Sequence, residues 1–174
     1  VLYSEPHSFK ITPNADFSGA ELMGANLLGY DLSNSTFGQS NFSEANFIGS
    51  SLSGSTFNGT NLWGADFSYV TMENTTLPNL PMVNMTGAHL SGSNFSSSDM
   101  TDIILKNADL SHADLSGANI TYLNRTPDLE NANLMGADLS GANLTGANLR
   151  GANLTGANLT GANLTGADLT DANI

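Results

Sequence analysis

Large apolar residues recur every five positions along almost the whole chain, and no other feature of the sequence restricts the fold as strongly. Thirty-one such positions hold Leu, Phe, Met or Ile, in runs from Phe17 to Leu77, Met85 to Ile120 and Leu129 to Ile174. An α-helix repeats every 3.6 residues and a flat strand every two, so neither keeps these residues on one side. The spacing therefore predicts an internal repeat rather than a conventional packed domain.

A coil with four sides of five residues each accounts for this period. Each repeat would direct one large residue, here called the centre, towards the axis and place a small residue, two positions earlier, in the corner. The C-terminal third follows this scheme almost literally as Ala-Asn-Leu-Thr-Gly. Coils of this kind stack through backbone hydrogen bonds about 4.8 Å apart. Thirty-one repeats predict nearly eight coils, with Phe17, Phe37 and Phe57 stacked along one side and Phe47 on Phe67.

The Ala-(Asp/Asn)-Leu-x-x pattern resembles the pentapeptide-repeat proteins over about residues 15–174. The resemblance implies an all-β fold, a right-handed quadrilateral β-helix. It implies little about activity, because the repeat is the scaffold itself. Most members of the family have no assigned activity, a few mimic duplex DNA and bind topoisomerase, and others are exported or lie in the thylakoid lumen.

Two breaks interrupt the register of the repeat. Leu77 and Met85 are eight residues apart, Ile120 and Leu129 are nine apart, and both intervals contain proline, which cannot donate to a backbone ladder. We expect bulged loops near 78–84 and 121–128. The second loop is either a tolerated corner insertion or a binding loop, and its candidate residues are Tyr122, Arg125 and Asp128.

Residues 1–14 precede the first repeat and form a separate N-terminal element. Terminal repeats of a solenoid need a cap, because the end of the axis is apolar. We expect 1–14 to be either that cap or an arm that docks onto another molecule, and 15–174 to be the β-helix.

The composition excludes several kinds of chemistry. The chain has no Cys, which removes disulfides and thiolate metal sites. Its net charge of −12 disfavours direct binding of nucleic acid. Convex polar faces around a filled axis offer no water-excluding cavity for catalysis. We therefore expect no enzyme activity, no cofactor and no metal site.

Location is predicted from the same composition. No apolar run approaches the roughly 20 residues that span a bilayer, so membrane insertion is not expected. The sequence starts at Val1 without the pattern of a signal peptide, which suggests a processed or trimmed start. Together with the absence of Cys, this favours an exported or lumenal protein (extracellular, periplasmic or thylakoid lumen) over a cytoplasmic one.

Two surfaces are candidates for protein partners. Four apolar residues each follow a centre and should face outward, with Tyr69 nearby: Met23, Leu28, Ile48 and Trp63. They form either a partner surface or the scattered apolar residues that any surface carries. The last coil should expose unpaired backbone groups around an apolar axis, which favours self-association. The residues of that end are Leu159, Leu164, Leu169 and Ile174.

These features favour a non-enzymatic structural or protein-interaction module. The alternative is a DNA mimic that binds a topoisomerase. Duplex DNA carries one charge per about 1.7 Å, or about 22 over the roughly 38 Å of this stack. The chain supplies a net charge of −12 and has Asn where a mimic needs Asp, for example at Asn143, Asn148 and Asn153.

Twelve Asn-x-Ser/Thr triplets, such as those at Asn143 and Asn158, occur along the chain. Asn before the centre and Ser or Thr after it are both part of the repeat. The triplets are therefore either products of the repeat or sites of glycosylation.

Overall fold

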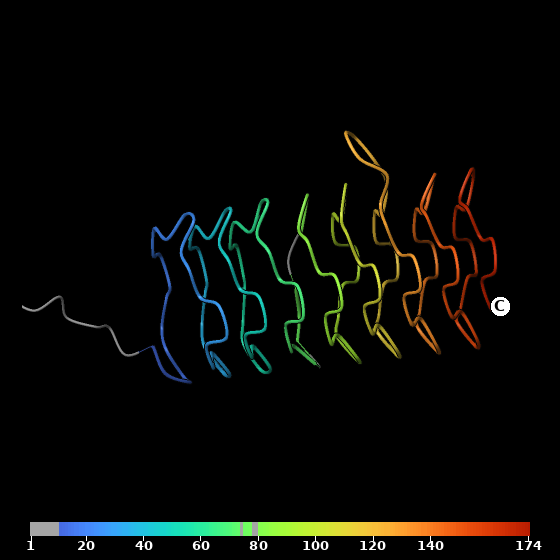
Figure 1. Ribbon diagram of the computed structural model, residues 1–174. Helices are drawn as coiled ribbons and strands as arrows, with labels where there is room; N and C mark the ends of the chain where they lie inside the picture. Colours follow the sequence, from blue (N-terminus) through green and yellow to red (C-terminus); the bar gives the residue numbers. More distant parts are fainter. Residues whose placement is uncertain (1–10, 74, 78–79) are drawn as a thin grey trace, which may run out of the picture.

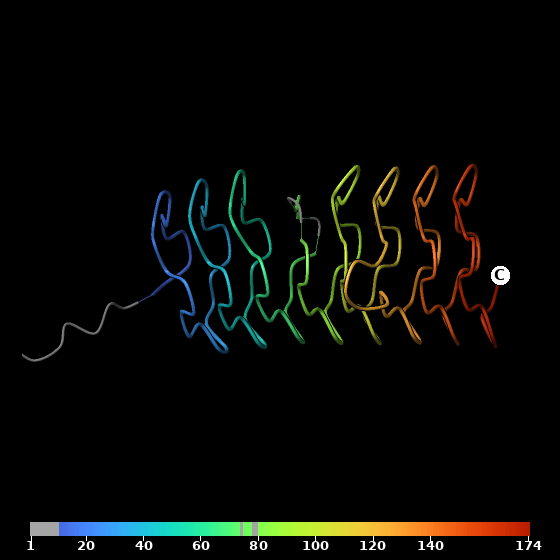
Figure 2. The same ribbon diagram turned by 90° about the horizontal axis from the view of Figure 1, so that it is seen from above.

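Parallel backbone pairing between successive coils builds a four-sided solenoid (Figures 1 and 2). The computed structural model describes residues 11–73, 75–77 and 80–174. None of these residues is helical, and none belongs to a strand of more than one paired residue. Instead each repeat contributes one paired residue, directly before its centre. Asp16 pairs with Thr36, for example, and Thr36 with Thr56.

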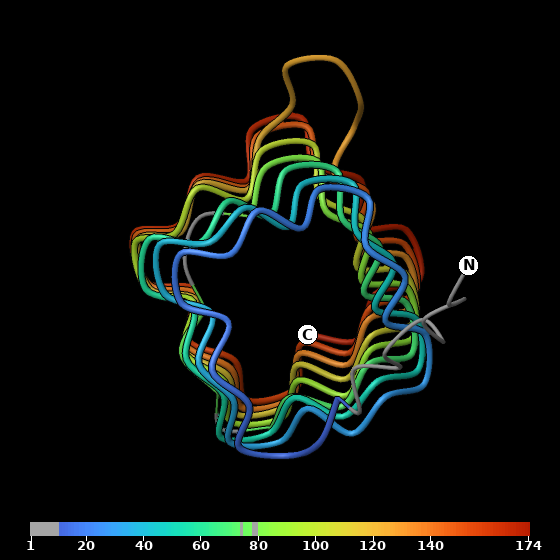
Figure 3. The same cartoon turned by 90° about the vertical axis from the view of Figure 1, so that its left-hand side faces the viewer.

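Four columns of paired residues define the four faces that are visible along the axis in Figure 3. Face 1 begins at Asp16, face 2 at Glu21, face 3 at Asn26 and face 4 at Asp31. Coils 1 to 8 begin at successive residues of face 1, namely Asp16, Thr36, Thr56, Thr76, Asn94, Asp114, Asp138 and Asn158. The predicted right-handed quadrilateral β-helix is confirmed.

Within the repeat at residues 132–136, every backbone N–H has a defined acceptor. The N–H of Ala132 closes the turn onto the Leu129 carbonyl at 3.0 Å. Asn133 donates to the preceding coil, while Leu134 and Gly136 donate to the following one, over 2.8–3.0 Å. The N–H of Met135 has no backbone partner and donates to Oδ1 of Asn133 at 3.3 Å. Where Asn or Asp precedes the centre, its side chain thus supplies the acceptor that the backbone lacks.

The Ser or Thr after the centre joins the same arrangement. The Thr145 hydroxyl donates to Oδ1 of Asn143 at 2.7 Å, and the Thr165 hydroxyl does so to Asn163. An amide oxygen with two lone pairs can accept both donors. Asn-x-Ser/Thr at these positions therefore has a structural cause in the turn itself.

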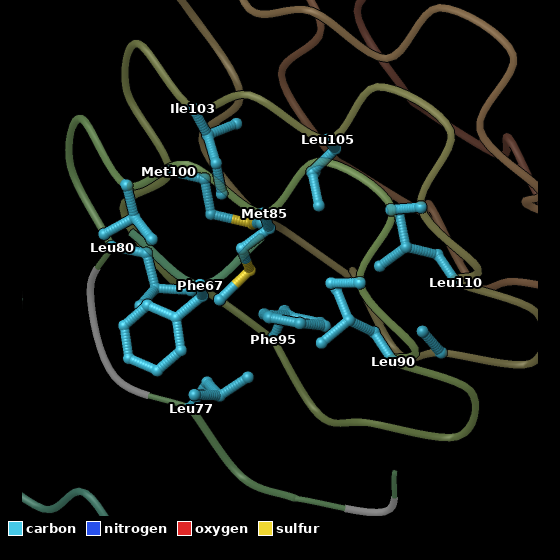
Figure 4. Close-up of a cluster of buried hydrophobic side chains, with 14 of the residues drawn as sticks. Phe67, Leu77, Leu80, Met85, Leu90, Phe95, Met100, Ile103, Leu105 and Leu110 are labelled. Atoms are coloured by element: carbon cyan, nitrogen blue, oxygen red, sulfur yellow. The ribbon is translucent and has the colours of Figure 1, made fainter. Parts of the chain in front are cut away.

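The centres fill the axis with close-packed side chains (Figure 4). The predicted phenylalanine stacks are confirmed: the rings of Phe17 and Phe37 are 5.0 Å apart, those of Phe37 and Phe57 are 4.7 Å apart, and those of Phe47 and Phe67 are 4.5 Å apart. These rings lie nearly parallel because equivalent residues of successive coils are related by a simple translation along the axis.

The break near 78–84 is present, but it shortens a coil instead of inserting a loop. Leu80 is fully buried, and its N–H donates to the Asp99 carbonyl at 2.6 Å, so Leu80 is itself a centre (Figure 4). Across this break Asp66 pairs with Asn84, which is 18 residues away rather than 20. The predicted bulge was therefore wrong: this coil has two residues fewer, and Leu80 supplies the thirty-second centre. Pro78 and Asn79 of that prediction lie outside the described residues.

The break at 121–128 is an insertion, as predicted. Paired residues across it, such as Asn119 and Asn143, are 24 apart instead of 20. The extra residues leave the solenoid as a projecting loop near the corner between faces 2 and 3 (Figures 1 and 3).

Of the N-terminal element 1–14, only residues 11–14 are described. Ile11 packs against the core, and the N–H of Asn14 donates to the Ser33 carbonyl at 2.9 Å.

Candidate protein-interaction surfaces

Large exposed apolar side chains gather on the first three coils. Met23 and Trp63 project from face 2 with 66% and 44% of their surface exposed, and Leu28 projects from face 3 with 56% exposed. Ile48 follows Leu28 one coil later and is half-buried. Tyr69 lies at the corner between faces 3 and 4, is 62% exposed, and its ring covers Gly87 of the next coil. We call these five residues the N-terminal patch.

The corner between faces 2 and 3 separates the two halves of the N-terminal patch. Glu44 occupies this corner in coil 2, with a backbone φ of 58°. Its side chain extends towards the next coil, where its Cγ lies 3.7 Å from the position that a Cβ on Gly64 would take. Glu44 therefore stands beside Trp63 and between the apolar side chains of the two faces.

The surroundings of the patch are acidic and contain no cation among the described residues. Coils 1 to 4 carry six carboxylates, none of which forms an ion pair with a described residue: Asp16, Glu21, Asp31, Glu44, Asp66 and Glu73. Hydrogen bonds from Ser18 and Thr36 lower the pKa of Asp16 to about 2, so this carboxylate is charged at neutral pH. The first half of the solenoid is therefore a negatively charged surface with an apolar patch.

The described cations belong to later coils and are engaged there. Lys106 forms an ion pair with Glu130 at 2.6 Å, and Arg150 lies 3.7 Å from a carboxylate oxygen of Asp168. Both pairs are on face 3. The Glu130 side chain raises the pKa of Lys106, and Lys106 lowers the pKa of Glu130, so both remain charged at neutral pH.

The projecting loop is held by a single buried carboxylate. Asp102 is 1% exposed, and its side chain accepts backbone hydrogen bonds from Leu123 at 2.7 Å, Arg125 at 3.0 Å and Asn124 at 3.0 and 3.1 Å. The guanidinium of Arg125 donates to the Asp102 carbonyl at 2.6 Å. Burial raises the pKa of Asp102, but these backbone donors outweigh it, and the pKa lies below its ordinary value. The base of the loop is thus tied to the solenoid through Asp102.

Three residues of this loop were candidates from sequence, and the structure gives them different roles. Tyr122 is exposed, and its ring lies across Gly146 of the next coil. Arg125 is bound back to Asp102. Asp128 is a paired residue of face 3, and its Oδ1 accepts from Glu130 and Asn148 at 3.1 and 3.0 Å. Leu123, which the sequence analysis did not select, is 78% exposed at the loop.

Asp102 was also not identified as a candidate from the sequence. It sits two residues after a centre, where the repeat usually has Gly, and its backbone φ is 59°. The signal available in the sequence was this Asp in a glycine position, about one coil before an insertion. Only the stacking of coils reveals that the two features are adjacent.

Among the described residues, no further coil stacks on the outer side of coil 8. Leu159, Leu164 and Leu169 are half-buried, while Ile174 is 75% exposed. In most earlier coils the N–H of a centre donates to the following coil, as Leu154 does to Asn173. The four last centres have no such backbone acceptor among the described residues.

Two further properties concern the part of the chain that the structure describes. No group of three or more His, Asp or Glu side chains there could hold a metal ion. Within the same residues, no helix has the length and apolar character needed to cross a bilayer.

The sequence matches the family model of pentapeptide repeats in eight copies, over residues 11–39, 40–79, 84–121 and 132–171. The chain belongs to the pentapeptide-repeat family. Proteins of this family are generally non-enzymatic structural or interaction modules. No curated protein sequence matches the chain.

Several solved structures are similar to this pentapeptide-repeat protein. HetL, involved in heterocyst differentiation regulation in the cyanobacterium Nostoc sp. strain PCC 7120, is 32% identical, with 92% of this chain and 87% of HetL covered and a TM-score of 0.42. QnrB1, a plasmid-mediated fluoroquinolone resistance protein, is 20% identical, with 93% and 90% covered and a TM-score of 0.47. A pentapeptide-repeat protein of the Arabidopsis thaliana thylakoid lumen is 24% identical, with 85% and 74% covered and a TM-score of 0.22.

Proposed function

We propose that this protein is a non-enzymatic interaction module that binds a protein partner through the N-terminal patch. The observation that carries the proposal is the concentration of exposed Met, Leu and Trp side chains on faces 2 and 3 of coils 1 to 3. The equivalent outward positions of coils 4 to 8 on these faces hold Thr or a charged residue, apart from Pro81. Exposed aromatic and aliphatic side chains in one region are typical of protein interfaces.

The scaffold supports a binding role over a catalytic one. Its axis is filled by the centres, so functional groups are carried on outer faces. Most Asn, Asp, Ser and Thr side chains on these faces are engaged in the turns of their own coils, as Asn143 and Thr145 are. Catalytic groups, in contrast, need a cavity that excludes water.

Site-specific photo-cross-linking tests the proposal in cells that natively contain the protein. A photoreactive phenylalanine at Trp63 should capture a discrete partner. The same residue at Thr165, which holds the equivalent position on face 2 in coil 8, should not capture that partner. With the partner purified, Trp63→Ala should weaken binding about tenfold or more while leaving the melting temperature nearly unchanged. Equal capture at both positions, or unchanged binding by the variant, would contradict the proposal.

The DNA-mimic alternative receives no specific support from the arrangement of charge. A mimic needs closely spaced negative charges along one side. In the four columns of paired residues, acidic side chains occupy at most two consecutive coils, Asp114 and Asp138 on face 1. Thr, Ser, Asn, His or Ile interrupt every column.

For the polypeptide of residues 1–174 we propose a second mode of association, in which the edge of coil 8 pairs with another copy of the chain. The unpaired N–H groups of Leu159, Leu164, Leu169 and Ile174 surround an apolar axis, and such an edge favours pairing with another chain. Sedimentation velocity over a wide concentration range should show growing oligomers. Ile174→Asp should reduce them without unfolding the chain, because Ile174 is already exposed. A monomer at every concentration would contradict this mode.

For the location of the protein we propose an exported or lumenal compartment. The support is compositional: the small corner position accepts Cys sterically, yet the whole chain contains none. Fractionation of native cells, with detection of this chain in the soluble cytoplasmic fraction alone, would contradict the proposal.

A further inference from the structure

We infer that the N-terminal patch receives a cationic amphipathic protein segment, in which Lys or Arg side chains flank apolar ones. This inference rests on the proposed function and names the chemistry of the partner. It follows from the position of Glu44 between the apolar side chains and from the six carboxylates of coils 1 to 4, which form no ion pair with any described residue.

Glu44 is the carboxylate that the patch leaves available to a partner. Other acidic side chains nearby are engaged within the solenoid: Glu21 accepts from the amide of Asn41 at 3.1 Å, and Asp66 accepts from the N–H and hydroxyl of Ser68 at 2.9 and 2.6 Å. No hydrogen bond or ion pair engages the Glu44 side chain among the described residues.

A partner that covers Met23, Leu28 and Trp63 must also cover this carboxylate, because Glu44 lies at the corner between their two faces. Removing a carboxylate from water without a counter-charge is strongly unfavourable. A cation on the partner offsets that cost and adds attraction to the acidic surface around it. A purely apolar partner would leave Glu44 unpaired, and an acidic partner would be repelled.

The single Trp of the chain makes this inference directly measurable. Trp63 is the only tryptophan and is part of the patch, so its emission reports occupancy. The probes are a synthetic amphipathic helix of Leu and Lys and its counterpart of the same length made of Leu and Glu. We expect the Leu/Lys peptide to shift the Trp63 emission to shorter wavelength in a saturable way, and the Leu/Glu peptide to have no effect.

Matched charge removals separate a specific contact from general attraction. Glu44→Gln should weaken binding of the Leu/Lys peptide about fivefold to tenfold. Glu73→Gln removes the same charge from face 4 of coil 3 and should change binding less than about twofold. Equal effects of the two variants, or binding of the Leu/Glu peptide or of neutral phosphatidylcholine vesicles, would overturn the inference.

The outcome is distinguishable from that of the proposed function. A natural partner captured at position 63 whose affinity does not change with Glu44→Gln would overturn this inference and leave the interaction module in place. If Trp63→Ala leaves the affinity for every captured partner unchanged, the interaction module itself is wrong.

Discussion

The carboxylate of Asp102 accepts a hydrogen bond from the backbone N–H of Leu123 at 2.7 Å, and this contact joins two neighbouring coils at the base of the projecting loop. Two further backbone donors converge on the same side chain. A buried carboxylate with three N–H partners is an energetically favourable anchor, because each donor is compensated and the charge is spread over them. The four-residue insertion is thereby held in one conformation.

Neutralising this anchor should release the loop without unfolding the solenoid. Asp102→Asn keeps the shape of the side chain but removes one acceptor and introduces an N–H₂ that faces the backbone donors. We expect limited trypsin digestion to cut after Arg125 several times faster in the variant, with the melting temperature little changed. Asp138→Asn is the matched control, since many repeats have Asn at that position. Equal cleavage rates in both variants would show that Asp102 does not hold the loop.

Acid should release the same loop. The folded-state pKa of Asp102 is lower than its ordinary value, so the carboxylate stabilises the loop at every pH above that ordinary value, about 3.9. This stabilisation is lost as the pH falls through the lowered folded-state pKa. The protection factors of the Leu123, Asn124 and Arg125 amides, which compare exchange with its intrinsic rate at each pH, should therefore stay high at pH 5 and fall below about pH 4. Release at pH 5 or above would contradict the stated direction, and Asp102→Asn should abolish the pH response.

A charge on the axis should unfold neighbouring coils. Leu144 is a fully buried centre in coil 7. Leu144→Asp places an unpaired carboxylate among apolar side chains and should cost several kcal/mol, with a large fall in melting temperature. Thr160→Asp adds the same charge on the exposed side of face 1 and should leave the melting temperature nearly unchanged. If Leu144→Asp melts like the parent protein, Leu144 does not point to the axis.

Two glycines with the same backbone conformation should differ in their tolerance of a methyl group. Gly87 and Gly141 both have φ of 65°. A Cβ on Gly87 would lie 2.6 Å from the Tyr69 ring, whereas a Cβ on Gly141 would meet nothing within 4 Å. Gly141→Ala should cost about 1 kcal/mol for the left-handed backbone, and Gly87→Ala about 0.5–1.5 kcal/mol more, because the exposed Tyr69 ring must leave its preferred rotamer. Chemical denaturation measures both values.

A rescue experiment checks the cause of that difference. Tyr69→Ser should remove the ring from Gly87, so that Gly87→Ala in this background costs no more than Gly141→Ala. A difference that persists without the ring would show that Tyr69 is not its cause.

Particular residues show how far sequence reasoning extends in a repeat of this kind. Phe37 and Leu144 could be assigned to the axis without coordinates, because each repeat adopts nearly the same local conformation and the period alone places its centre. Leu80 was missed because its corner has two residues fewer, and a search at intervals of five passes over it. The outward direction of Trp63 followed from the period, but the presence of Glu44 beside it did not.

The sequence by itself determined the four-sided coil, the identity of nearly every centre and the existence of the insertion at 121–128, because these depend on contacts that repeat with the five-residue period. Only the tertiary structure decided the length of each coil and therefore which residues of successive coils meet. Asp102 reaches Leu123 across 21 positions, and the rings of Tyr69 and Tyr122 cover Gly87 and Gly146 of the following coil. Such contacts depend on the stacking register, which changes by two or four residues at each break, and a local pattern does not specify that change.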